Sequence, residues 1–216
     1  MSPLLRRLAC LALAAVWAGS AAAQLPAPND PAFEYETAMN YLTGQGVARD
    51  PVEAVAWLRK AAQQGHAEAQ VQLGVCFQSG TGVPADAEQA FEWFRKAAEQ
   101  GNPRGQLQLG LAYQRGRGVP VDIAKGLELV RKAAEAGHPK AQLDLGLAYR
   151  DGFGTNPDPE QAAFWVALSA SQGSPVARAV LPQVRSKLAP EQRAAVAQRV
   201  EAWRKQHPAQ PVAEGP

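Results

Sequence analysis

The stretch GTGVPAD, residues 80–86, decides the fold class because of where it recurs. Alone, a Gly-x-Gly before a helix start fits a phosphate-binding loop, since glycines let backbone N–H groups approach a phosphate. Three further copies each begin 36 residues from the next, namely GQGVARD at 44–50, GRGVPVD at 116–122 and GFGTNPD at 152–158. No copy has the Gly-Lys-Ser/Thr ending or the third glycine of nucleotide-binding fingerprints. A turn that recurs at one period instead predicts a repeat array.

The segments between these turns have helical periodicity. Apolar residues recur at intervals of three and four, as in Ala69, Leu73 and Phe77. Each glycine turn supplies a left-handed residue that ends one helix, and its final aspartate caps the next. Other positions also repeat every 36 residues, among them Gly65, Gly101, Gly137 and Gly173, and Tyr41, Phe77, Tyr113 and Tyr149. Each unit is therefore predicted to be two helices, and stacked units share one core.

The full unit, AQVQLGVCFQSGTGVPADAEQAFEWFRKAAEQG at residues 69–101, resembles the Sel-1-like repeat family. The resemblance covers roughly residues 33–187 and implies a fold similar to that of the tetratricopeptide repeats. We therefore expect an all-α, right-handed α-solenoid of about five helix-turn-helix hairpins with a 36-residue repeat. Its units are placed at residues 31–65, 66–101, 102–137 and 138–173, with an atypical C-terminal cap at 174–207.

The two ends of the chain are predicted to lie outside this array. Arg6 and Arg7 precede the short apolar run LACLALAAVWAG and a small-residue site, which is typical of a secretory signal cleaved after Ala23. We expect an exported protein, periplasmic in a two-membrane bacterium, with a linker at 24–30 and a disordered tail at 208–216. The apolar run is shorter than the roughly 20 residues that span a bilayer.

Charge argues against nucleic acid and membrane surfaces as partners. Removing Arg6 and Arg7 from the 22 basic residues leaves 20 against 20 acidic ones, and no basic stripe is interleaved with aromatics. Residues 24–58 contain five acidic residues and one basic, whereas 174–207 contain seven basic and two acidic. This polarity could guide head-to-tail contact. We expect a monomer, with weak self-association possible.

Reactive side chains give no sign of catalysis, a metal or a cofactor. Cys76 has Asn40, Ala112 and Ala148 at its repeat positions, which favours a small, partly buried side chain over a redox thiol. His66 and His138 lie two units apart, too far to share a metal. Some cysteine-rich members of the family are linked to penicillin binding or β-lactamase activity, but the paired cysteines of those members are not found here.

The resemblance implies a partner-binding groove on the first helix of each unit. Exposed positions two before and two after the Leu-Gly core would give an apolar ladder of Tyr35 and Met39, Val71 and Val75, Leu107 and Leu111, and Leu143 and Leu147. Charged residues would flank it, namely Glu68, Arg104, Lys140 and Arg150. The ladder fits an extended peptide or an amphipathic helix. Alternatively, the same side chains pack between neighbouring first helices.

Three functions stay open at this point. A scaffold, adaptor or regulator that binds a protein partner in the cell envelope follows from the family, whose members assemble envelope complexes, modulate sensor kinases or support motility and polysaccharide export. A cell-wall or β-lactam-active enzyme is the alternative from another class. A self-assembling structural element is the third.

Overall fold

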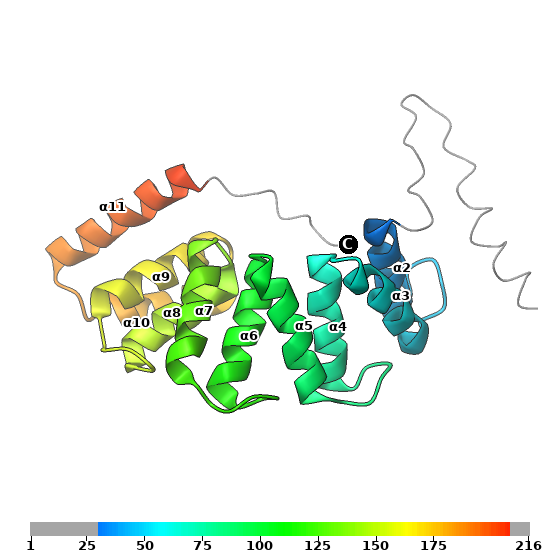
Figure 1. Ribbon diagram of the computed structural model, residues 1–216. Coiled ribbons are helices and arrows are strands. Elements are labelled where there is room, and N and C mark those ends of the chain that lie inside the picture. Colours follow the sequence, from blue (N-terminus) through cyan, green and yellow to red (C-terminus); the bar gives the residue numbers. More distant parts are fainter. Residues whose placement is uncertain (1–29, 208–216) are drawn as a thin grey trace, which may run out of the picture.

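The computed structural model describes residues 30–207, and every element in that range is a helix. The helices are α2 (Pro31–Thr43), α3 (Pro51–Gln63), α4 (Ala67–Ser79), α5 (Ala87–Glu99), α6 (Pro103–Arg115), α7 (Ile123–Glu135), α8 (Pro139–Asp151), α9 (Pro159–Ser171), α10 (Pro175–Arg185) and α11 (Pro190–Gln206). From α2 to α9 they stack as successive antiparallel pairs into an elongated array (Figure 1). The expectation of an all-α solenoid is confirmed. The predicted signal, its cleavage site, the linker and the tail lie outside the described residues.

Local sequence explains where the helices begin and end. The glycine at the end of each first helix is left-handed, as at Gly80 with φ of 72°. The turn aspartates then cap the second helices, so that Asp86 Oδ1 accepts a hydrogen bond from the Gln89 N–H at 3.0 Å. First helices are capped in turn by His66, Asn102, His138 and Ser174. The predicted glycine turn and aspartate cap are therefore present in the four units from α2 to α9, whereas α10 has its C-cap at Ser186 without them.

Glycines within the first helices let the paired helices approach closely. A Cβ added at Gly146 in α8 would lie 3.0 Å from Val166 N and 3.1 Å from Ala162 O, both in α9. The core runs along the array through such contacts and buries Leu73, Phe94, Leu145 and Leu168 among its larger side chains. The repeat glycine is thus required by packing distance rather than by backbone conformation.

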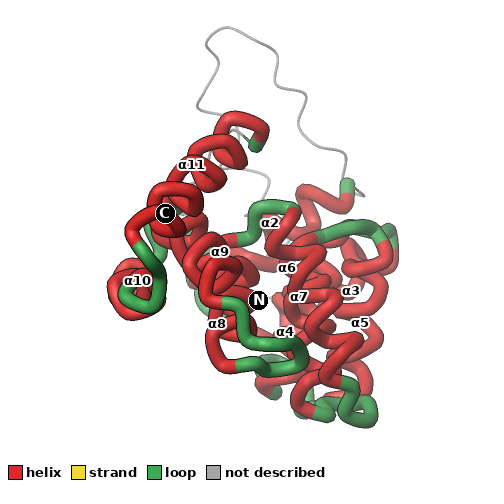
Figure 2. The backbone as a smooth tube through the Cα atoms, turned by 90° about the vertical axis from the view of Figure 1, so that its left-hand side faces the viewer, coloured by secondary structure: helices red, strands yellow, loops and turns green. Residues whose placement is uncertain are grey.

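The last two helices depart from this arrangement. Pro182 in α10 stands at the register of Gly74, Gly110 and Gly146. A proline ring at this register adds bulk where the other units need none and removes a helical hydrogen bond. Instead of pairing with α10, α11 lies across α9, and its Trp203 reaches the Gly137 turn between α7 and α8 (Figures 1 and 2). The C-terminal cap is therefore atypical because a standard hairpin cannot close on α10.

Candidate partner-binding surface

At the centre of the array the first helices of neighbouring units lie on the inner side of a bend. Helices α4 and α6, which belong to neighbouring units, pack directly on one another, whereas the second helices α5 and α7 make at most marginal contact. Helices that converge lie on the inside of a curve. We call the face of α2, α4, α6 and α8 that points to this inside the concave face.

Five of the eight predicted ladder residues are accessible on the concave face. Val71, Leu107 and Leu143 are 0%, 1% and 7% exposed, so the prediction that they line an open groove is wrong. They fill the hydrophobic core between neighbouring helices, which was the alternative interpretation. The half-buried members are Tyr35, Met39, Val75, Leu111 and Leu147. For these residues a role in binding stays a prediction.

The flanking charges are partly engaged with their neighbours. Arg104 lies 3.7 Å from the Glu68 carboxylate and donates a hydrogen bond to Gln72 Oε1 at 3.2 Å. Arg150 pairs with Asp151 at 2.7 Å. Exposed pairs of this kind contribute little to stability, so they remain available to exchange partners. The structure therefore keeps the predicted charges at the rim without fixing them.

A polar row beside the ladder was missed in the sequence. Gln72, Gln108 and Asp144 share one register, three residues before Val75, Leu111 and Leu147, and all three are half-buried. The three residues do recur at the 36-residue period in the sequence. The change from glutamine to aspartate in the last copy hides this repeat. Asp144 matters most, since it lines a cavity.

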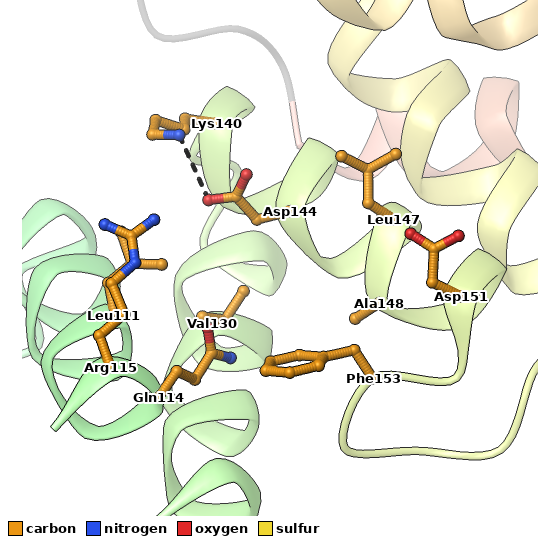
Figure 3. A pocket seen from close by; sticks show the side chains of 10 residues that line it. All are labelled: Leu111, Gln114, Arg115, Val130, Lys140, Asp144, Leu147, Ala148, Asp151 and Phe153. Carbon is orange, nitrogen blue, oxygen red and sulfur yellow. Dashed lines mark ion pairs between the residues drawn. The ribbon is translucent and has the colours of Figure 1, made fainter. Parts of the chain in front are cut away.

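This cavity lies between α6, α7 and α8 and encloses about 240 Å³ (Figure 3). We call it the Asp144 pocket; its lining comprises Leu111, Gln114, Arg115, Val130, Lys140, Asp144, Leu147, Ala148, Asp151 and Phe153. An apolar floor thus lies beneath a rim that has both positive and negative groups. Phe153 contributes from the glycine turn after α8, where 44% of its surface is exposed.

A second cavity of about 310 Å³ lies one unit earlier and shares part of its lining positions with the Asp144 pocket. Its lining residues Gln78, Phe94, Ala112 and Arg117 are the repeat equivalents of Gln114, Val130, Ala148 and Phe153. The junction between units therefore leaves a recurrent hollow, and the local sequence sets its chemistry. The Asp144 pocket has an aromatic ring in place of the Arg117 side chain of the second cavity.

Asp144 is the electrostatically unusual group of the pocket. Within residues 30–207 its buried Oδ2 has no hydrogen-bond partner, although Lys140 Nζ lies 3.4 Å away as an ion pair. Burial raises the pKa of this carboxyl above its ordinary value, and Lys140, Arg115 and His138 oppose that rise. The neighbouring Arg115 guanidinium makes no hydrogen bond or ion pair within the described chain.

No catalytic or metal constellation is found in the part of the chain that the structure describes. No group of three metal-ligating side chains comes together there. The Cys76 thiol is buried, and this burial raises its pKa to about 11, so the unreactive thiol form predominates at neutral pH. His66 and His138 cap α4 and α8 through their Nδ1 atoms. Each of these histidines thus uses one ring nitrogen as a capping acceptor.

No helix within residues 30–207 combines the length and apolar character needed to cross a membrane.

Comparison with known proteins identifies the repeat. The Sel1 repeat model matches residues 31–66, 67–102, 103–138 and 139–174. A Sel1 repeat protein from Oxalobacter formigenes is 32% identical, with a TM-score of 0.65 over 82% of this chain and 72% of that one. A protective antigen with an SLR fold, present in uropathogenic Escherichia coli strains, is 25% identical, with a TM-score of 0.53 over 87% of this chain and 50% of that one. The comparison with curated proteins finds no match.

Proposed function

Because this chain belongs to the Sel1 repeat family, whose members are generally protein-interaction scaffolds, we propose that it is an adaptor that binds a segment of a partner protein on its concave face. The signal-like residues 1–23 support a place of action outside the cytoplasm, in the bacterial cell envelope. The proposal also takes the chain to be a non-enzymatic scaffold, as is typical of the family.

One observation supports this proposal above the others. Met39, Val75, Leu111 and Leu147 repeat at 36 residues along the first helices and remain half-exposed, while most of their apolar neighbours are buried. A row of reachable aliphatic groups gains about 25 cal/mol for each Å² that a partner covers. Polar residues at the rim then set its orientation. The row is therefore suited to an extended or helical segment that crosses several units.

Cross-linking in cells tests this binding surface. Cells that express the tagged chain are compared with cells that express its Leu111→Arg/Leu147→Arg variant, and co-purified proteins are identified by mass spectrometry. Two arginines in the row should abolish capture, because they charge a surface that binding must desolvate. Val52→Arg is the matched control, since Val52 on the second helix α3 is 67% exposed and lies off the concave face.

The outcomes separate the remaining functions. A partner captured by the parent and the control but lost from the double variant supports the adaptor. An unchanged partner moves the site to the convex side or the ends, and no partner in any sample leaves self-assembly or enzymatic activity to be tried. Hydrolysis of a chromogenic β-lactam by the purified protein would contradict the non-enzymatic role.

Export is tested separately. Cell fractionation should place the tagged chain outside the cytoplasm, and N-terminal sequencing should begin at Gln24. A cytoplasmic protein with an intact N-terminus would remove the envelope from the proposal and leave the binding surface untouched.

A further inference from the structure

The Asp144 pocket presents three kinds of group toward one opening. Leu111, Val130, Leu147 and Phe153 provide apolar walls, Asp144 provides an acceptor, and Arg115 provides a donor. In Figure 3 Arg115 projects from α6, while Asp144 and Leu147 project from α8 across from it. A ligand that fits must therefore combine an apolar group with both a donor and an acceptor.

The size of the pocket restricts the apolar group. A cavity of about 150 Å³ holds a benzene molecule. The roughly 240 Å³ here accommodates one aliphatic side chain together with part of its backbone. Because Leu111 and Leu147 of the half-exposed row line it, the pocket is open to a chain that runs along the concave face.

The polar atoms match the rest of a peptide. The buried Oδ2 of Asp144 lacks a hydrogen bond and calls for a donor, while the exposed Arg115 guanidinium, which makes no hydrogen bond or ion pair within the described chain, can donate to an acceptor. A backbone N–H and the nearby C=O of an extended peptide supply one of each. Lys140 covers Asp144 in this structure, with its Nζ 3.4 Å from Asp144 Oδ2 and no hydrogen bond between them. The Lys140 side chain is 60% exposed, so it can move away from Asp144.

The charges around the opening give no net preference for a charged ligand side chain. The lining has Arg115 and Lys140 against Asp144 and Asp151, so its formal charge is zero. The walls that a side chain would contact inside the pocket are apolar, namely Leu111, Val130, Leu147 and Phe153. An aliphatic side chain therefore fits the interior.

We propose that the Asp144 pocket is the anchor subsite of the concave face, which receives one aliphatic side chain of an extended peptide whose backbone N–H donates to Asp144 and whose carbonyl accepts from Arg115. This inference rests on the proposed adaptor function and specifies the part of the partner that enters the groove. It places the anchor at the junction of α6, α7 and α8 rather than spreading it evenly along the array.

A capped peptide tests the subsite directly. The protein with isotope-labelled leucine methyl groups is titrated with N-acetyl-Ala-Leu-Ala-amide, and the Leu111 and Leu147 resonances are followed by NMR. Both should shift with saturable binding. The same peptide with an N-methylated leucine lacks the donor and should bind about tenfold more weakly or worse, because the lost hydrogen bond is made to a charged group.

Variants locate the acceptor. Asp144→Ala should weaken binding of the leucine peptide about tenfold and lose the preference for the unmethylated form, whereas Asp144→Asn should keep part of both. Gln108→Ala is the matched control, because Gln108 has the same register one unit earlier and does not line this pocket. Circular dichroism on each variant confirms that the fold is retained.

Each contrary result has a definite meaning. Equal affinity for the N-methylated peptide would overturn the backbone contact to Asp144. Tighter binding of N-acetyl-Ala-Asp-Ala-amide would overturn the aliphatic specificity, and equal or tighter binding of free leucine would make the pocket an amino-acid site. Absence of any methyl shift at millimolar peptide would overturn the subsite altogether. In that case the cross-linking result with the Leu111→Arg/Leu147→Arg variant would be unaffected. The subsite can therefore be disproved without disproving the adaptor role.

Discussion

Gln172 donates a hydrogen bond from its Nε2 to Oε1 of Gln142 at 2.7 Å, across two helices and 30 residues of sequence. An equivalent bond joins Gln100 to Gln70 two units earlier, and Gln64 to Glu34 at the N-terminal end. In each case the donor is the residue that ends a second helix, and the acceptor lies in the first helix of the same unit. The result is a polar ladder that ties each pair of helices together.

The third unit breaks this ladder. Ala136 stands where Gln64, Gln100 and Gln172 stand in the other units, and the Gln106 Oε1 opposite it is buried without a partner in the described chain. Ala136→Gln should restore the bond, because Ala136 has the same backbone conformation as the glutamines. We expect thermal unfolding to shift upward by about 1–5 °C, from a gain of about 0.5–1.5 kcal/mol.

A double-mutant cycle controls this prediction. In a Gln106→Ala background the Ala136→Gln change should give no gain, since the acceptor is gone. An equal gain in both backgrounds would show that glutamine acts through helix propensity alone.

His138 should make the stability of the array depend on pH. Its Nδ1 accepts a hydrogen bond from the Ala141 N–H, which only the unprotonated atom can do. Burial lowers the pKa of His138, Arg104 and Lys140 lower it further, and Asp144 opposes them. The unfolded state therefore binds the proton more readily, so stability is full above the ordinary pKa of about 6.5 and is lost as pH falls through the folded value.

His138→Asn provides the matched test, because Asn102 caps α6 at the same register. Between pH 7.5 and pH 5 the unfolding free energy of the parent should fall by more than that of the variant, because asparagine has no proton to bind. Chemical denaturation at several pH values measures it. Parallel curves for the two proteins would exclude His138 as the source.

The buried and the half-buried members of the predicted ladder should respond differently to a charged substitution. Leu107→Arg places a charge in the core and should cost about 3–5 kcal/mol of stability. Leu111→Arg should cost about 1 kcal/mol or less, because the side chain at this half-buried position can extend to water. Urea denaturation of both variants decides the matter. Similar losses for the two would mean that no member of the row is free to bind a partner.

Bulky residues at both ends of the array disfavour stacking with a second copy of the chain. Phe33 stands at the register of Ala69, Gly105, Ala141 and Ala177, which are buried against the preceding unit, and Pro182 blocks the glycine register at the other end. We predict a monomer in sedimentation velocity at all accessible concentrations. A sedimentation coefficient that rises with concentration and falls in salt would instead show that the acidic and basic ends associate.

Much of the candidate site could be predicted from the 36-residue periodicity. The prediction that Val71, Leu107 and Leu143 are exposed was wrong for a geometric reason. Val71 and Val75 are one helical turn apart and share the same apolar character in the sequence. Whether either faces the groove depends on how closely the neighbouring helix approaches, and this distance is set by residues in other units. The Asp144 pocket was missed for the same reason, since its lining comes from three helices and a turn.

The sequence by itself determined the repeat, the helix boundaries and the family, because each depends on local chemistry. Positive φ at glycines, aspartate caps and a fixed period of 36 residues are properties of short segments. Only the tertiary structure decided which apolar residues stay exposed, that α11 folds back over α9, and that an aspartate, an arginine and a phenylalanine meet around one cavity. These depend on how close the helices approach one another, which no single repeat encodes.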